Sequence, residues 1–317
     1  MTGKAFASTD DTAERKIAID QIGAGLYALT AEGDPNSGIV VGDDGVMVID
    51  AQPTPAMAEE LIARVAKITD KPIKYVLLTN FHAVRALGAS AFKGAEILAC
   101  DVTRGLIAER GKQDMDSEIG RFPRLFRAAD TIPGLTWPAV TFPDQISVWL
   151  GRREVRLMHI GRGHTAGDVI AVVPDAGVVF AGALVEYKSA CDCGDAHFSE
   201  WLAAIDHVAE MQPLALLPGR GPALTTADQV AEGLALTSDF LSTLYGSVSE
   251  SVAKGRSLKE AFDLVRLLMD PKFKSFALYE SCLPFNVVRA YDEARGVDWP
   301  VIWTVERDRE MWAALQG

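Results

Sequence analysis

Two successive runs of short strand-like segments, with helical segments beside them, restrict the folds that this chain can adopt. The first run comprises Gly25–Leu29, Ser37–Val41, Val46–Asp50, Ile73–Leu78 and Ala95–Ala99. The second run comprises Ile146–Leu150, Val155–His159, Val169–Val173, Val178–Ala181 and Leu214–Leu217. Helical periodicity marks the segments Pro53–Ile68, Val102–Arg110, Asp116–Ala128 and Phe198–Met211. This order predicts an α+β protein in which two sheets pack together and helices lie outside them.

From Thr225 onward the apolar periodicity is almost wholly helical. Helices are expected at Ser257–Met269 and Lys274–Arg295, after a long apolar stripe that comprises Val230, Leu234, Leu241, Leu244, Val248 and Val252. We therefore predict three parts, which are a flexible polar tail (residues 1–17), a catalytic-type domain (residues 18–222) and an all-helical extension (residues 223–317). The stripe fits either a buried core or the surface of a homodimer.

The charge balance excludes some classes of partner. The 43 acidic residues outnumber the 31 Lys and Arg, which gives a net charge of −12 and a pI near 4.9. Nucleic acids and anionic membranes bind clustered basic residues, so we expect neither as a partner. Residues 1–20 lack the apolar core of a secretory signal, and no apolar run is long enough to cross a bilayer. With four cysteines and no disulfide framework, the sequence predicts a soluble cytoplasmic protein.

A polar loop, Thr79–Ala89, follows the apolar segment that ends at Leu78. Loops at the ends of buried strands are where α/β proteins usually place their chemistry. The hexapeptide Asn80-Phe81-His82-Ala83-Val84-Arg85 resembles the His-x-His-x-Asp-His signature of the metallo-β-lactamase superfamily. Only the second His of that signature is present, as His82, while Asn80, Val84 and Arg85 stand at the positions of the other ligands.

A second loop, Gly161–Asp168, resembles the Gly-His-Thr-x-Gly-Asp loop of the same superfamily and carries His164. Two further segments match motifs of the superfamily but lack the metal ligand. Ala183 stands where the superfamily usually has a bridging Asp, and Arg220 replaces the His of a Pro-Gly-His-Gly turn. The resemblance covers about residues 18–222 and implies a four-layer αββα sandwich with an ancestry among metal-dependent hydrolases of esters, lactones, thioesters or amides.

The residues at the expected ligand positions are poorly suited to bind two metal ions. The first metal position should be lined by Asn80, His82 and His164, and a hydrolytic zinc needs about three protein ligands. The second position should be lined by Val84, Arg85, Ala183 and Arg220, which offer no ligand, and two guanidinium groups would repel a dication. We therefore expect either no cofactor or a single weakly bound metal ion, for which zinc is the leading candidate.

The two arginines suggest a different use for the site. A guanidinium group is always charged and offers a bidentate fork to carboxylate or phosphate, so Arg85 and Arg220 are predicted to bind a small anionic molecule. The alternative is that each forms a salt bridge with an acid such as Asp168, Glu186 or Asp195. Asp195 and His197 follow the strand that precedes Ala183, and they are expected to face the same pocket.

Three functions stay open at this point. The first is a metal-poor pseudoenzyme that binds a small anion in the former active site. The second is an active hydrolase with one metal ion held by His82, His164 and a third ligand, either Asp195 or His197. The third is a structural or partner-binding homo-oligomer that uses the apolar stripe. A separate zinc site at Cys191 and Cys193 is the weakest alternative, because two thiols at this short spacing provide too few ligands.

Overall fold

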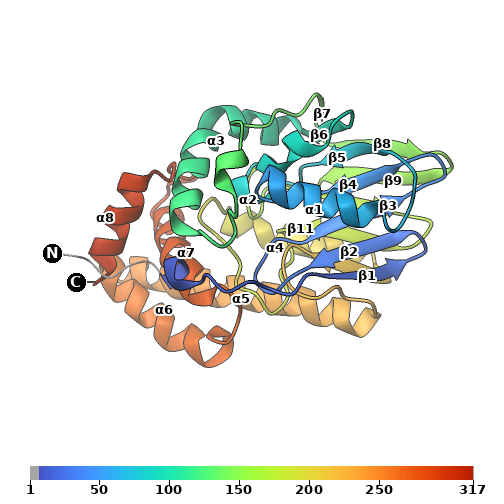
Figure 1. Ribbon diagram of the computed structural model, residues 1–317. Coiled ribbons are helices and arrows are strands. Elements are labelled where there is room, and N and C mark those ends of the chain that lie inside the picture. The colour runs from blue at the N-terminus through green and yellow to red at the C-terminus, as the bar shows by residue number, and fades with distance from the viewer. Residues whose placement is uncertain (1–6, 317) are drawn as a thin grey trace.

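The computed structural model describes residues 7–316 and contains two β-sheets packed face to face (Figure 1). The first sheet has the order β1 to β7, with β1 (Ala18–Gly23), β2 (Leu26–Thr30), β3 (Ser37–Val41), β4 (Val46–Ile49), β5 (Ile73–Leu77), β6 (Glu96–Cys100) and β7 (Val140–Phe142). The second sheet has the order β12 (Ala215–Pro218), β11 (Val178–Gly182), β10 (Val169–Val173), β9 (Arg153–His159) and β8 (Gln145–Leu150). Strands β4 to β7 are parallel, and β12 is parallel to β11, so the loops that follow these strands open at common sheet edges.

Apolar packing holds four layers together. Side chains such as Met47, Leu157 and Phe180 form the core between the two sheets. The outer face of the first sheet packs against α1 (Pro55–Val65). The outer face of the second sheet packs against α4 (Phe198–Glu210) and α5 (Ala227–Ala253). The predicted four-layer αββα sandwich is therefore confirmed.

The predicted helical extension is also present. Beyond α5, the helices α6 (Leu258–Phe273), α7 (Tyr279–Ala294) and α8 (Val305–Gln316) lie together at one end of the molecule (Figure 1). The apolar stripe of α5 is buried against α4, α7 and the second sheet, with Leu244 and Val248 fully inaccessible. The stripe from Val230 to Val248 is therefore core within this chain, while Val252 is half-buried. The predicted homo-oligomer stays a prediction.

The prediction of two separate helices between residues 102 and 128 was wrong. The sequence suggested two helices at Val102–Arg110 and Asp116–Ala128, but one continuous helix, α3 (Asp101–Arg121), replaces them. Its middle is held by tertiary contacts, because the carboxylates of Asp114 and Glu118 accept hydrogen bonds from the first backbone N–H groups of α2 (Ala83–Ala86). The strands β1 and β7 and the helix α8 were not predicted.

The predicted flexible tail is described only in part. Residues 1–6 lie outside the described residues. The short 3-10 helix η1 (Ala7–Asp10) contacts α7, and Asp11 forms an ion pair with Arg124 over 2.8 Å. Within residues 7–316, no helix combines the length and apolar character that a membrane span requires.

Candidate active site

His82 lies in the loop after β5, directly before α2, and its side chain is buried (6% exposed). Its Nδ1 atom is 2.9 Å from Oδ1 of Asp114, while Oδ2 of the same carboxylate accepts the backbone N–H of Ala83 at 2.7 Å. One turn further along α3, Glu118 accepts the N–H of Val84 at 3.2 Å. The two acids of α3 therefore fix the imidazole ring and the start of α2 together.

The buried acids change the protonation of this cluster. Burial by itself would lower the pKa of His82, but the carboxylates of Asp114, Glu118 and Asp195 raise the pKa to about 10. Burial and the charge of Asp114 raise the pKa of Glu118 well above its usual range, although His82 opposes this. In the absence of another cation, the site thus retains protons to balance its excess of carboxylates.

His164 lies in the second predicted loop and is brought next to His82. The centroids of the two imidazole rings are 4.9 Å apart. Nδ1 of His164 is 3.3 Å from Asp168, whose other oxygen accepts the backbone N–H of Thr165 at 2.7 Å and so shapes the loop. Burial lowers the pKa of His164, so its ring is neutral and keeps a lone pair for a ligand.

Asp195 approaches the same place from the loop before α4. Its Oδ1 atom accepts a 2.6 Å hydrogen bond from Arg110 of α3, and its Oδ2 atom lies 3.9 Å from Nε2 of His82. Among the described residues, His82, Asp114 and Asp195 form the one group of three whose ligand-type atoms lie within 4.8 Å of one another. Two atoms bound to the same zinc ion at about 2.0–2.2 Å are at most about 4.4 Å apart, so these side chains would have to move slightly closer together to hold a single cation.

The expected second metal position is filled by a charge network. Arg85 donates to Asp50 at 2.7 Å and to the carbonyl of Gly219 at 3.2 Å, and it lies 3.8 Å from Glu186. Arg220 donates to the same Glu186 at 3.4 Å. Both guanidinium groups therefore have carboxylate partners, as the alternative to anion binding required. The residues do not fit a two-metal centre, because cationic side chains hold the carboxylates in this place.

The three remaining predicted site residues, Asn80, Ala183 and His197, are all buried but differ in their hydrogen bonding. Asn80 is fully buried, and its Oδ1 atom caps the backbone N–H of His82 at 3.2 Å, while its Nδ2 atom has no partner. Ala183 is buried and contributes no polar atom. His197 is 1% exposed, and neither ring nitrogen has a partner. Burial and the nearby guanidinium groups of Arg162 and Arg289 lower the pKa of His197 to about 4.

The structure thus unites His82, His164 and Asp195, and it adds three residues that sequence reasoning missed. Arg110, Asp114 and Glu118 are spaced by four residues and therefore lie on one face of α3. That spacing was visible in the sequence, but the predicted break between two helices hid it. The Cys191 and Cys193 thiols are buried and form no disulfide, and among residues 7–316 neither belongs to a group of three possible metal ligands.

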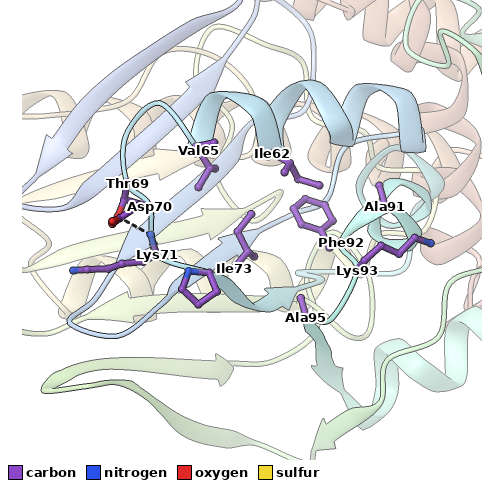
Figure 2. A pocket seen from close by; sticks show the side chains of 12 residues that line it. Ile62, Val65, Thr69, Asp70, Lys71, Ile73, Ala91, Phe92, Lys93 and Ala95 are labelled. Carbon is purple, nitrogen blue, oxygen red and sulfur yellow. Dashed lines mark hydrogen bonds between the residues drawn. The ribbon is translucent and has the colours of Figure 1, made fainter.

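A cavity of about 450 Å³ lies elsewhere, between the end of α1, the start of β5 and the η2 turn (Leu87–Ala91). Figure 2 shows Ile62, Ile73 and Phe92 facing one another across it, with Lys71 and Lys93 directed away to either side. Its lining contains no His or Cys.

Comparison with known proteins agrees with this location. Residues 30–220 match the metallo-β-lactamase superfamily, and the chain belongs to that superfamily. It is 20% identical over 261 residues to a linear primary-alkylsulfatase of Pseudomonas sp. (strain ATCC 19151), covering 71% of this chain and 48% of the alkylsulfatase. The chain thus spans about half the length of that relative. It is 25% identical over 202 residues to a metallo-β-lactamase type 2 of Bacillus cereus, covering 61% of this chain and 71% of that one.

Solved structures show the same fold. A metallo-β-lactamase from Pontibacter korlensis superposes with a TM-score of 0.57 at 21% identity, covering 71% of this chain and 99% of that one. The DIM-1 metallo-β-lactamase superposes with a TM-score of 0.56 at 16% identity, covering 74% of this chain and 99% of that one.

Proposed function

We propose that this protein is a hydrolase whose two-metal site has been reduced to one cation position beside His82. The observation that carries the proposal is the buried group of His82, Asp114 and Asp195, with ligand-type atoms within 4.8 Å. Three carboxylates, counting Glu118, lie around one imidazole in a place sealed from solvent. Such an excess of buried negative charge favours a bound cation, because unpaired buried charges are costly.

The neighbouring side chains would orient the ligands. Asp114 accepts from Nδ1 of His82 and from the N–H of Ala83, so its role would be to orient the ring and to add negative charge. The atoms left to bind the cation are Nε2 of His82 and Oδ2 of Asp195, with the neutral ring of His164 beside them. Arg110 holds one oxygen of Asp195 and leaves the other free. These are the supporting hydrogen bonds that metal ligands usually require. A zinc ion bound here would supply a Lewis acid for the hydrolysis of an ester, lactone, thioester or amide.

Metal analysis tests this proposal directly. Protein purified without chelator and dialysed against micromolar zinc is expected to retain about one equivalent per chain. Asp195→Asn should lose that equivalent, whereas Asp116→Asn should keep it, because Asp116 is an exposed residue of α3 that pairs with Lys112. Retention of zinc by both variants, or absence of zinc from the parent protein, would refute the proposal.

A second candidate keeps the metal-poor, anion-binding function. The observation that favours it is Arg220, which is buried (4% exposed) and whose Nε atom has no partner. A small carboxylate could accept a hydrogen bond from this N–H without displacing Glu186. Calorimetry with acetate at millimolar concentration should then detect binding to zinc-free protein and lose it in Arg220→Ala. No heat of binding in the parent protein would eliminate this candidate.

A further inference from the structure

The segment between α7 and α8 crosses the opening of the candidate site. Trp299 and Pro300 line a narrow cavity together with Phe81, Leu106 and His197, and the cavity has no room for a water-sized molecule. Phe81 and Leu106 are 2% and 4% exposed, whereas Trp299 is 44% exposed. The segment therefore lies between the cavity and solvent, and a ligand can enter only if part of the wall moves.

Polar contacts, more than apolar burial, hold this segment in place. Arg289 donates to the carbonyl groups of Val297 and Asp298 at 2.7 and 2.9 Å. Trp299 donates from Nε1 to Glu109 at 3.1 Å. The apolar side chains of Val297 and Val301 are 38% and 47% exposed. Arg162 also donates to both carboxylate oxygens of Asp298, at 2.9 and 3.1 Å, in a pair that water can reach because the Asp298 side chain is 70% exposed. Because exposed ion pairs add little stability and the segment buries little apolar surface, it can open locally at a lower cost in free energy than the core.

Arg110 connects this segment to the site beneath it. Its Nη1 atom donates to Oδ1 of Asp195 at 2.6 Å and also to the carbonyl of Pro300 at 3.2 Å. Its guanidinium carbon lies 5.5 Å from the ring centroid of Trp299. The same buried cation therefore contacts the candidate metal ligand and the covering segment, so a change in the position of either one alters the contacts of the other.

We propose that residues 296–301 form a lid over the candidate site and that Arg110 couples closure of this lid to the position of the Asp195 carboxylate. A small molecule would enter beneath Trp299 and would meet His197, whose ring nitrogens have no partner in the protein. The lid follows from the geometry alone. The meaning of the coupling for metal binding rests on the function proposed above.

Thiol labelling measures opening of the lid without any metal. The four native cysteines are buried, so Ala166→Cys places the reactive thiol of interest in the cavity wall with little background. In this background Trp299→Ala should speed labelling by 5,5′-dithiobis-(2-nitrobenzoate) about tenfold, because it removes a hydrogen bond and a cation–π contact. Lys112→Ala, on the exposed side of α3, is the matched control and should change nothing. Equal labelling rates in the two variants would refute the lid.

Hydrogen exchange tests the coupling and serves as a second measurement should Ala166→Cys fold poorly. In metal-free protein, Asp195→Asn weakens the anchor of Arg110, and the peptide covering residues 296–304 should exchange about threefold faster or more. Asp116→Asn should leave that peptide unchanged. If Trp299→Ala accelerates exchange of the peptide and Asp195→Asn does not, coupling through Arg110 is refuted. Both measurements are made without zinc, so they remain decisive even if the protein binds no metal.

Discussion

Arg85 should contribute more to the stability of this protein than an ordinary surface arginine. Its side chain is 1% exposed, and it contacts Asp50 at 2.7 Å, Gly219 at 3.2 Å and Glu186 at 3.8 Å. The substitution Arg85→Met keeps most of the side-chain volume and removes the charge. Two buried carboxylates then lose their shared cationic partner.

The magnitude follows from what is left behind. Removing one partner of a buried ion pair typically costs about 3–5 kcal/mol, because the remaining charge is neither paired nor hydrated. The lost hydrogen bond to the Gly219 carbonyl adds about 1 kcal/mol. Some of this loss will be recovered when the carboxylates take up protons. We therefore expect the free energy of unfolding at pH 7 to fall by about 4 kcal/mol.

Urea denaturation followed by circular dichroism measures this change, with Arg152→Met as the matched control. Arg152 also pairs with an Asp, Asp43, at 2.8 Å, but its side chain is 92% exposed, so its loss should not move the midpoint measurably. The double variant Asp50→Asn with Arg85→Met should be more stable than the Arg85→Met single variant. If Arg85→Met unfolds at the same urea concentration as Arg152→Met, the buried ion pairs of Arg85 do not stabilise the fold and the reasoning from burial is refuted.

Three further predictions follow from individual contacts. Burial raises the pKa of Glu186 to about 7. Its contribution to stability is therefore complete below about pH 4.5 and is lost as the pH rises through 7. Glu186→Gln should make the thermal midpoint less dependent on pH between these two values. Gly38→Ala should destabilise the protein by about 1–3 kcal/mol in urea denaturation, because the added methyl group would lie 2.4 Å from the Phe180 ring in the core between the sheets. Asn80→His combined with Ala183→Asp should leave the zinc content at one equivalent and not raise it to two, since the charge network still fills the second position; two zinc ions by elemental analysis would contradict this.

Much of the fold could be read from local patterns. Alternating and continuous apolar segments located most of the strands, and the glycine-framed loops around His82 and His164 located the site, because strand ends and tight turns leave strong local signals. The polar segment at β1 and the three-residue β7 were missed, since their pairing partners rather than their own residues make them strands. The same applies to α3, whose continuity depends on contacts with α2.

The sequence by itself determined which metal ligands are absent. At the ligand positions of the superfamily motifs it has Asn80, Val84, Ala183 and Arg220. What replaces those ligands was decided by the tertiary structure alone. Arg85 meets Asp50, a residue 35 positions away, and Asp195 meets His82 and Arg110 across more than 80 positions. Charge pairs of this kind carry no local periodicity, so only the packing of the sheets, α3 and the C-terminal segment reveals which carboxylates pair with arginine and which surround His82.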